Sequence, residues 1–572
     1  MLTTGNRNTS AKGRRGTKAK APSVDGPTGR TLRSAADTVA LALMRALKAS
    51  GTRRLFGVPG GGSSLDLIEA AHSQGMAFVL ARHECAAVFM ACATAEMDGS
   101  IGAALTTKGP GTANAANGLA QASLDRNPVV LLTDGFSPAA QRYVTHQWFD
   151  QRALMAPVAK GHSLLADGDV HADIDRLMAL ALSPRQGPVH IELTGAAARA
   201  PLARRAPARP ARDRVTPASD LLASAGELLG QARLPVIVVG LESRSRDVTA
   251  AVRKAARALA CPVLVTYKAK GVIADGAPLY GGIFTGGLAE QALMKQADLI
   301  VLVGMDPVEL ILQPWAYQAP VLEIGLARHP VHYVEPTVAL HGDIAGSLAA
   351  ITAGRTRSAW QAAQIAHLRA QMLAGLAYRG QGKGLSPQVV VEEAASAALA
   401  LPVWPRVTVD AGAHMFSATA FWPCHAPNDL LISNGLATMG FALPAAIASA
   451  LHQPGRCTVA FTGDGGLMMC LGELATAVQE QARIVVVVFN DASLSLIDIK
   501  QQQRELPVRG VRWDRPDFAL VMRGLGGKGY KAAGVAAYRR ALAAAFADEG
   551  PSLIDVTVDP TGYPSQLAAL RG

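Results

Sequence analysis

The sequence predicts an α/β protein with three doubly wound parallel-sheet domains. Its 572 residues suffice for about three to five domains of roughly 100–200 residues each. Apolar runs of strand length alternate with helical stretches, a pattern typical of parallel sheets covered on both faces. The first and last parts of the chain also repeat one plan, in which a strand, a glycine turn, a helix and a second strand follow one another.

Two segments look like connections between these domains. Residues 195–217 contain six Arg and four Pro without an apolar period, so we expect an extended surface linker there. Residues 356–385 are expected to form a helix, near 358–375, and a second linker. The predicted domains are therefore residues 35–194, 218–355 and 386–572.

Residues 1–34 differ from the rest of the chain in charge. They hold eight Lys or Arg residues against Asp25 alone, which accounts for most of the formal net charge of +11. We expect a disordered basic extension, although an organelle transit peptide has a similar composition. The remaining residues are nearly balanced in charge, so no nucleic-acid partner is expected.

The cysteine pattern and the length of the apolar runs indicate the cellular compartment in which the protein is expected. The six cysteines are scattered and form no C-x-x-C motif, which favours a reducing compartment over a disulfide scaffold. Strongly apolar runs such as 484–489 are far below the roughly 18 residues of a membrane helix. We therefore expect a cytoplasmic protein that does not contact a membrane.

The elements of the first two domains follow from apolar runs and turns. The first domain is expected to have strands at 78–82, 101–106 and 129–133 and helices at 84–97 and 112–125. The turn Gly109-Pro110-Gly111 connects the strand at 101–106 to the helix at 112–125. The middle domain is expected to have strands at 235–239, 263–266 and 299–303 and helices at 246–259 and 287–297. Its first strand is not followed by G-x-G-x-x-G, so a standard dinucleotide site is not predicted.

The third domain carries the most informative turn. Its strand at 458–462 meets Gly463-Asp464-Gly465-Gly466, and a helix with a 3.6-residue rhythm follows over 467–478. Ligands of open parallel sheets lie beyond the carboxyl ends of strands, and a glycine turn that opens a helix favours an anion. Asp464 would repel a bare phosphate, which indicates a bridging cation.

A second carboxylate follows the next strand, at 484–489. Asp491 lies 27 residues after Asp464. Mg²⁺ prefers oxygen ligands and commonly bridges carboxylates to phosphates. We therefore predict that Asp464 and Asp491 bind Mg²⁺ and that a diphosphate completes the metal's coordination shell. The alternative is that Asp464 caps its helix and Asn490-Asp491 forms a turn.

Together these motifs resemble thiamine-diphosphate-dependent enzymes of the acetolactate synthase type. Gly463-Asp464-Gly465 with Asn490-Asp491 matches the cofactor fingerprint, and the resemblance extends over about residues 35–560. It also includes the segments 82–84, 108–114, 127–130 and 433–440. The resemblance implies a pyrimidine-binding domain first, a middle domain second and a domain that binds diphosphate and Mg²⁺ third.

The resemblance also implies roles for single residues. Glu84 matches the family's activating carboxyl group, which lets the cofactor's aminopyrimidine remove the proton from thiazolium C2. Met439 matches the residue that holds the cofactor bent, with core packing as its alternative role. Ser493 would offer a backbone carbonyl to Mg²⁺. The residues expected to contact the cofactor are Glu84, Gly412, Ala413, His414, Gly435, Met439, Gly463, Asp464, Gly465, Gly466, Asp491 and Ser493. Because the family's activating Glu faces a cofactor held by the partner chain, a homodimer or homotetramer is implied.

Departures from the family pattern concern the substrate side and flavin. Lys108 stands where the family usually has Ser. Thr145-His146-Gln147 resembles the catabolic, flavin-independent synthases, and Gly304-Met305-Asp306-Pro307 replaces an Arg-rich segment of flavin-containing members, which argues against FAD. Residues expected on the substrate side are Lys108, His146, Gln147, Leu496 and Ile497.

The favoured function is a thiamine-diphosphate- and Mg²⁺-dependent carboligase or lyase acting on 2-oxo acids, with conversion of pyruvate to acetolactate as the best single assignment. The chain lacks a His-His doublet and a His at 106–108, which are the proton donors expected of 2-oxo acid decarboxylases. A decarboxylase of the benzoylformate, sulfopyruvate or phosphonopyruvate type is one alternative. A nonenzymatic nucleotide-binding protein is another.

Overall fold

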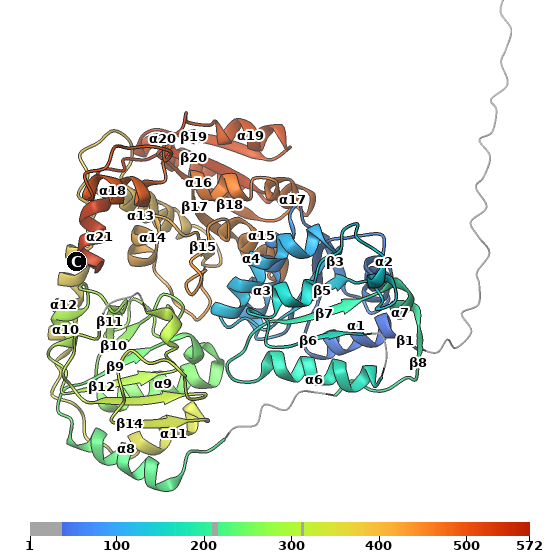
Figure 1. Cartoon of the computed structure of the whole chain (residues 1–572). Coiled ribbons are helices and arrows are strands. Elements are labelled where there is room, and N and C mark those ends of the chain that lie inside the picture. The colour runs from blue at the N-terminus through green and yellow to red at the C-terminus, as the bar shows by residue number, and fades with distance from the viewer. Residues whose placement is uncertain (1–36, 166–167, 209–214, 311–313, 572) are drawn as a thin grey trace, which may run out of the picture.

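The computed structural model describes residues 37–165, 168–208, 215–310 and 314–571. It contains three parallel six-stranded sheets, each flanked by helices (Figure 1). This arrangement confirms the predicted fold class. The basic extension predicted for residues 1–34 lies outside the described residues.

The first domain is a sheet with strand order β3-β2-β4-β5-β7-β6. Its central strands β4 and β5 are fully buried, as expected for continuous apolar runs in a parallel sheet. The strands are β2 (Arg54–Val58), β3 (Ala77–Leu80), β4 (Gly102–Thr106), β5 (Val129–Asp134), β6 (His162–Leu164) and β7 (Val189–Leu193). The helices are α1 (Val39–Ala49), α2 (Ser63–Ser73), α3 (Glu84–Asp98), α4 (Pro110–Leu124), α5 (Gln151–Met155) and α6 (Val170–Leu182), with a 3₁₀ turn η1 (Ala140–Arg142).

The linker predicted over residues 195–217 is not extended at its start. Residues after β7 form a short helix, α7 (Gly195–Arg199), and a short strand, β8 (Pro201–Leu202), which pairs antiparallel with β1 (Asp37–Thr38). Ala198 of α7 is fully buried against the first domain's core. The start of the predicted linker therefore packs on the first domain, because its small residues cover α1 and α2.

The middle domain has strand order β11-β10-β9-β12-β13-β14. Its strands are β9 (Pro235–Val239), β10 (Val263–Val265), β11 (Tyr280–Ile283), β12 (Leu299–Val303), β13 (Val321–Gly325) and β14 (Val338–His341). Its helices are α8 (Ser219–Gln231), η2 (Leu241–Arg244), α9 (Arg246–Leu259), α10 (Gln291–Met294), η3 (Pro307–Glu309) and α11 (Ile344–Thr352), and α12 (Ala362–Gly375) follows.

The helix predicted over 287–297 shrinks to the four residues of α10. The backbone before it is held by other contacts, since Leu288 N–H donates to the carbonyl of Leu570 and the Glu290 carboxylate accepts from Gly287 N–H. The prediction of a long helix here was wrong, because residues 287–290 follow an irregular path that the contact with Leu570 and the Glu290 side chain hold in place.

The third domain repeats the strand order of the first, as β16-β15-β17-β18-β20-β19. Its strands are β15 (Arg406–Val409), β16 (Leu430–Ile432), β17 (Thr458–Gly463), β18 (Ile484–Asn490), β19 (Lys528–Ala532) and β20 (Ser552–Thr557). Its helices are α13 (Pro387–Ala398), α14 (Met415–Phe421), α15 (Ala442–His452), α16 (Asp464–Met469), α17 (Glu473–Gln479), α18 (Ser495–Gln503), α19 (Phe518–Gly524), α20 (Val535–Ala547) and α21 (Tyr563–Arg571). The single helix predicted after the glycine turn is thus two helices, α16 and α17.

The first and third domains share a hydrophobic core. Helix α3 packs against α15, and the rings of Phe89 and Phe441 meet edge to face with centroids 5.7 Å apart. The middle domain has a core of its own. All six cysteines are buried, and none is in a disulfide.

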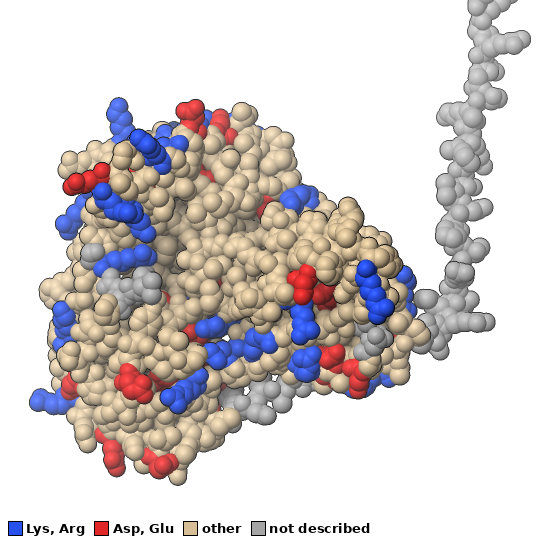
Figure 2. Space-filling view, in the orientation of Figure 1, with Lys and Arg blue, Asp and Glu red and all other residues tan. Residues whose placement is uncertain are grey.

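Figure 2 shows acidic and basic side chains scattered over one face of the molecule, with a row of Lys and Arg where the first and middle domains adjoin. None of the helices in the described part of the chain combines the length and the apolar character needed to cross a bilayer.

Candidate active site

Two carboxylates meet at the carboxyl ends of the neighbouring strands β17 and β18. Asp464 is the first residue of α16, directly after β17, and Asp491 directly follows β18. The two strands pair in parallel up to Gly463 and Phe489. The Asp464 carboxylate accepts a hydrogen bond from the backbone N–H of Ala492 at 2.6 Å, so the two strand ends are joined.

The electrostatics of this pair fit a cation site. Burial and the neighbouring Asp491 raise the pKa of Asp464 to about 7. Burial raises the pKa of Asp491 to about 6, against hydrogen bonds from Ser495 and Ser493 that lower it. Asp464 is buried and Asp491 is half-buried, and their like charges repel each other. Such a pair is an oxygen donor set of the kind that Mg²⁺ uses. Among the described residues, no group of three or more His, Cys, Asp or Glu side chains is arranged to hold a metal, so further ligands would be backbone or substrate oxygens.

Ser493 lies between these carboxylates and the segment that follows α18. Its hydroxyl donates to the carbonyl of Val511 at 3.2 Å, and its N–H donates to Asp491 at 3.2 Å. The hydroxyl and the N–H of Ser493 are thus both engaged, and the predicted metal contact of this residue concerns its backbone carbonyl.

His414 forms one wall beside the glycine turn. Its ring stacks on Phe489 with centroids 5.1 Å apart, and a Cβ on Gly412 would lie 2.9 Å from the ring. Burial lowers the pKa of His414 to about 4, so the ring is neutral near pH 7. Its Nε2 is buried and has no hydrogen-bond partner among the described residues. An orphaned ring nitrogen beside a glycine cradle fits a polar group of a bound cofactor.

Gly465 and Met439 face each other across this cradle. A Cβ on Gly465 would lie 3.4 Å from Met439 Cε, 3.0 Å from Leu494 Cδ2 and 3.3 Å from Trp513. The cradle thus has little room for a larger residue at this position. Trp513 was not predicted from the sequence, because it reaches the cradle from a loop 48 residues later in the chain.

Asp410 is a second residue that sequence reasoning missed. It is fully buried and accepts hydrogen bonds from Thr462 Oγ1 and from the N–H groups of Gly440 and Phe441. A Cβ on Gly466 would lie 2.5 Å from the Asp410 carboxylate. Burial raises the pKa of Asp410 to about 6. The residue ties the glycine turn to the segment that carries Met439.

Glu84 begins α3 and is 8% exposed. Its carboxylate accepts a hydrogen bond from Asn114 of α4 at 2.9 Å, and a Cβ on Gly111 would lie 3.2 Å from it. Just before Glu84, the N–H groups of Arg82 and His83 both donate to one oxygen of Glu473, at 2.9 Å each. Glu473 opens α17, so the break between α16 and α17 lets the third domain hold the loop that carries Glu84.

Three of the predicted substrate residues lie near one another in the first domain. Lys108 Nζ sits 5.1 Å from the centre of the Phe136 ring. Gln147 adopts a φ of 56°, and its carbonyl would lie 2.5 Å from a Cβ on Gly109, the residue after Lys108. His146 is exposed on the same loop.

The other two predicted substrate residues differ in their surroundings. Leu496 is partly buried and packs against a cluster that contains Ala413. Ile497 is 44% exposed. Ile497 is therefore the more accessible of the two beside the metal loop.

Gly435 lies at the boundary with the first domain. Its N–H donates to Asp125 at 2.6 Å, and a Cβ would lie 2.5 Å from the carbonyl of Leu124. These contacts explain a glycine at this position through domain packing. Its predicted contact with the cofactor stays a prediction.

Comparisons with known proteins agree with this geometry. Residues 37–154 match the N-terminal TPP binding domain of thiamine pyrophosphate enzymes, residues 222–351 match their central domain, and residues 410–556 match their C-terminal TPP binding domain. The chain is 28% identical over 529 residues to the acetolactate synthase of Bacillus subtilis, covering 89% of this chain and 91% of that protein. It is 29% identical over 535 residues to the probable 2-ketoarginine decarboxylase of Pseudomonas aeruginosa, covering 91% and 94%. It is 28% identical over 549 residues to the catabolic acetolactate synthase of Raoultella terrigena, covering 92% and 96%.

Proposed function

We propose that this chain, which belongs to the thiamine pyrophosphate enzymes and is acetolactate synthase-like, releases CO₂ from pyruvate and joins the remaining two-carbon unit to a second pyruvate to give acetolactate. The observation that carries the proposal is the carboxylate pair Asp464 and Asp491 beside a glycine cradle. Thiamine diphosphate, when bound, supplies the nucleophilic carbon and the electron sink of this reaction.

The third domain supplies groups for binding. Asp464 and Asp491, with the carbonyl of Ser493, would hold Mg²⁺, and the metal would neutralise the diphosphate. The backbone N–H groups of the turn that begins at Gly463 would bind the phosphate oxygens, and the ring of His414 would line the cradle beside them. Met439 would support the cofactor's rings from the apolar side.

Glu84 would hold a proton at the cofactor's pyrimidine. Its polar partner within the chain is Asn114, and no contact among the described residues joins it to Asp464 or Asp491. We therefore propose that the active unit is at least a homodimer, in which Glu84 of one copy serves the cofactor bound by the third domain of the other.

A second candidate function is decarboxylation of a 2-oxo acid with an anionic side group, such as a sulfonate or phosphonate. Lys108 favours it, because this half-buried cation has no ion-pair partner among the described residues. The chain is also similar to a relative named as a probable decarboxylase. That relative's name concerns a different substrate, so the likeness supports the reaction type alone.

We leave flavin out of the proposed cofactor set. At the carboxyl edge of the middle sheet, the Glu309 carboxylate already accepts from Leu241 N–H at 2.9 Å and Thr266 Oγ1 at 2.5 Å. Burial raises the pKa of Glu242 at the same edge to about 8. A flavin diphosphate placed there would compete with these carboxylates for the same donors.

The test is a panel of 2-oxo acids with CO₂ release and product identification, run with and without thiamine diphosphate and Mg²⁺. We expect pyruvate to give acetolactate only when both are present. An aldehyde product would favour the decarboxylase instead. Cofactor binding without CO₂ from any acid would support a nonenzymatic binding protein and contradict the proposal.

A further inference from the structure

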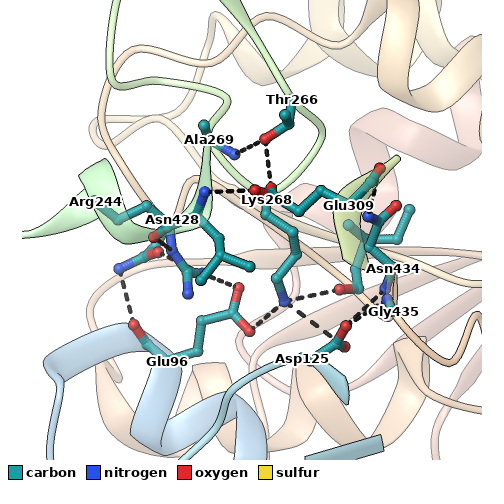
Figure 3. Close-up of polar contacts among 12 residues, drawn as sticks. Glu96, Asp125, Arg244, Thr266, Lys268, Ala269, Glu309, Asn428, Asn434 and Gly435 are labelled. Carbon is teal, nitrogen blue, oxygen red and sulfur yellow. Dashed lines mark hydrogen bonds and ion pairs between the residues drawn. The ribbon is translucent and has the colours of Figure 1, made fainter. Parts of the chain in front are cut away.

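A buried network of charged side chains lies where all three domains meet (Figure 3). Lys268 of the middle domain, Glu96 of α3 and Asp125 at the end of α4 have side chains at most 1% exposed. Lys268 Nζ donates to Glu96 at 2.7 Å and to the carbonyl of Ile432 at 3.0 Å, and it lies 3.8 Å from the Asp125 carboxylate. One ammonium group therefore touches the first and the third domain at once.

Asp125 extends the network to the backbone of the third domain. One of its oxygens accepts the N–H groups of Asn434, at 3.1 Å, and Gly435, at 2.6 Å. Farther along the same segment, Thr438 Oγ1 accepts from Asn117 of α4 at 3.1 Å. Residues 432–438 are thus fixed by side chains of two other domains.

The far end of this segment is fixed by Asp410, which accepts from the N–H groups of Gly440 and Phe441 at 3.1 and 3.2 Å. Met439 lies between the two attachments. A shift of Ile432 or Gly435 would therefore move Met439 relative to Gly465.

The charges of the network compensate one another. Burial alone would raise the pKa of Glu96, but Lys268 and Arg244 outweigh burial and hold that pKa below its ordinary value. Buried ion pairs often add little net stability compared with apolar residues of similar volume, whereas they can fix a unique geometry. In this chain the geometry that they fix is the path of residues 432–435.

We propose that Lys268 is a positioning residue for the cofactor site, acting through Ile432 and Asp125 on Met439. The proposal rests on the proposed function, because Met439 matters to catalysis only if thiamine diphosphate lies beside it. Lys268 itself touches neither the carboxylate pair nor the glycine turn in the described structure.

Lys270 offers a matched control two residues away. Its side chain is equally buried, at 1% exposed, and its Nζ donates to Asp275 at 2.7 Å. Asp275 in turn contacts the backbone of Cys424, not the segment that leads to Met439. Lys268→Met and Lys270→Met therefore each remove one buried cation from the same stretch of the middle domain, and only the first removes contacts to Ile432 and Asp125.

The first measurement uses the full chain without cofactor. Hydrogen–deuterium exchange by mass spectrometry should show at least about tenfold faster exchange in peptides spanning 432–441 for Lys268→Met, and no such change there for Lys270→Met. Equal exchange of this segment in both variants would overturn the positioning role.

The second measurement uses protein loaded with thiamine diphosphate and Mg²⁺. In Lys268→Met we expect exchange of the C2 proton to slow about tenfold while the cofactor dissociation constant changes less than threefold. Unchanged C2 exchange, or an equal loss in Lys270→Met, would contradict the inference. Should Lys268→Met not fold, Glu96→Gln combined with Lys268→Gln removes the opposite charges together and is expected to give the same result. A wild-type chain that binds no thiamine diphosphate would instead refute the proposed function, whatever the variants show.

Discussion

The first and third domains have the same topology and carry different chemistry. In both, the strand order can be written 2-1-3-4-6-5, and in both the third strand ends at a glycine turn that opens a helix. The turn of the first domain, Gly109-Pro110-Gly111, has no acidic residue, whereas that of the third domain contains Asp464. One sheet edge thus offers a turn without a carboxylate, next to Lys108 and Glu84, and the other offers a carboxylate pair.

The difference shows that a doubly wound sheet determines where a ligand binds and leaves the turn residues to determine which ligand. Each domain also holds the other's functional loop with one carboxylate. Glu473 of the third domain accepts two N–H groups just before Glu84, and Asp125 of the first accepts two N–H groups just before Met439. The two sites are therefore expected to respond to different substitutions and to share a dependence on the contact between the domains.

The largest effect on function is expected at the carboxylate pair, because loss of the cofactor would abolish every later step. Asp464→Ala or Asp491→Ala should weaken thiamine diphosphate binding by at least about 100-fold, the loss expected for a charge-assisted contact of about 3 kcal/mol. Removal of Mg²⁺ from the wild type with a chelator should have the same effect, measured by calorimetry. Lys108→Ala is the control in the first domain and should leave cofactor affinity unchanged. Unaltered affinity in Asp464→Ala would contradict the metal assignment.

Much of the fold could be predicted because strand and helix patterns are local. The strand at 235–239 and the helix at 246–259 have the bounds predicted from apolar runs. Predictions failed where contacts with residues far away in the chain determine the backbone path, as before α10, where Leu288 donates to the carbonyl of Leu570. The break between α16 and α17 was missed for the same reason, since it places Glu473 against a loop 390 residues earlier in the chain.

The candidate site also contains residues that the sequence predicts and residues that it does not. The proximity of Asp464 and Asp491 follows from sequence, because adjacent parallel strands end at one edge. The carboxylates that support the site, Asp410, Asp125 and Glu473, could not be recognised. Their partners are mainly backbone N–H groups, which carry no side-chain signature, and two of the three reach across a domain boundary.

The next largest effect is expected at Glu84 of the first domain, on the rate of proton exchange. Glu84→Gln should retain cofactor binding and slow exchange of the cofactor's C2 proton by about 10²–10⁴-fold, because an amide does not supply the proton that a positioned carboxyl group supplies. Proton NMR of the bound cofactor after acid quench measures this rate. The result expected for Asp464→Ala is the opposite, with binding lost first. Wild-type exchange in Glu84→Gln would remove Glu84 from the proposed role.

A pair of glycine substitutions compares the two turns directly. Gly111→Ala places a Cβ 2.9 Å from Thr107 Cγ2 and 3.2 Å from a Glu84 oxygen, and Gly465→Ala places one 3.0 Å from Leu494 and 3.4 Å from Met439. Small displacements of catalytic groups cost up to about 100-fold in rate, so we expect about tenfold slower C2 exchange in Gly111→Ala at normal cofactor affinity. Gly465→Ala should weaken cofactor binding as well. Identical phenotypes would show that the two turns do not divide their tasks as proposed.

Glu473 tests the contact between the domains. Glu473→Ala leaves two part-buried N–H groups, of Arg82 and His83, without their acceptor and should cost about 1 kcal/mol in the free energy of unfolding. Glu473→Gln keeps an acceptor oxygen and should cost less.

The same residue predicts a pH dependence. Burial raises the pKa of Glu473 above its ordinary 4.5. The folded chain therefore binds this proton more tightly than the unfolded chain, and this group's contribution to stability declines as pH rises from 4.5 through the folded-state pKa. Urea unfolding from pH 4.5 upward should show a shallower decline for Glu473→Gln than for the wild type. Parallel profiles would show that Glu473 does not titrate in this way.

The smallest effect is expected at Lys108, on the first domain's turn. Its ammonium group lies over the Phe136 ring, 5.1 Å from the centre, and contacts of this kind contribute about 0.5–1 kcal/mol at partly exposed sites. If the cation also pairs with the carboxylate of a 2-oxo acid on binding, Lys108→Ser should raise KM severalfold with a smaller change in kcat, since the ion pair forms in the ground state and the carboxylate loses its charge as CO₂ leaves. Phe136→Leu is the matched control, because it removes the ring and keeps the charge, and it should change KM less than Lys108→Ser does. Equal KM values for Lys108→Ser and the wild type across the acid panel would return Lys108 to the role of a solvated loop residue, and the chemistry of the first domain would then rest on Glu84.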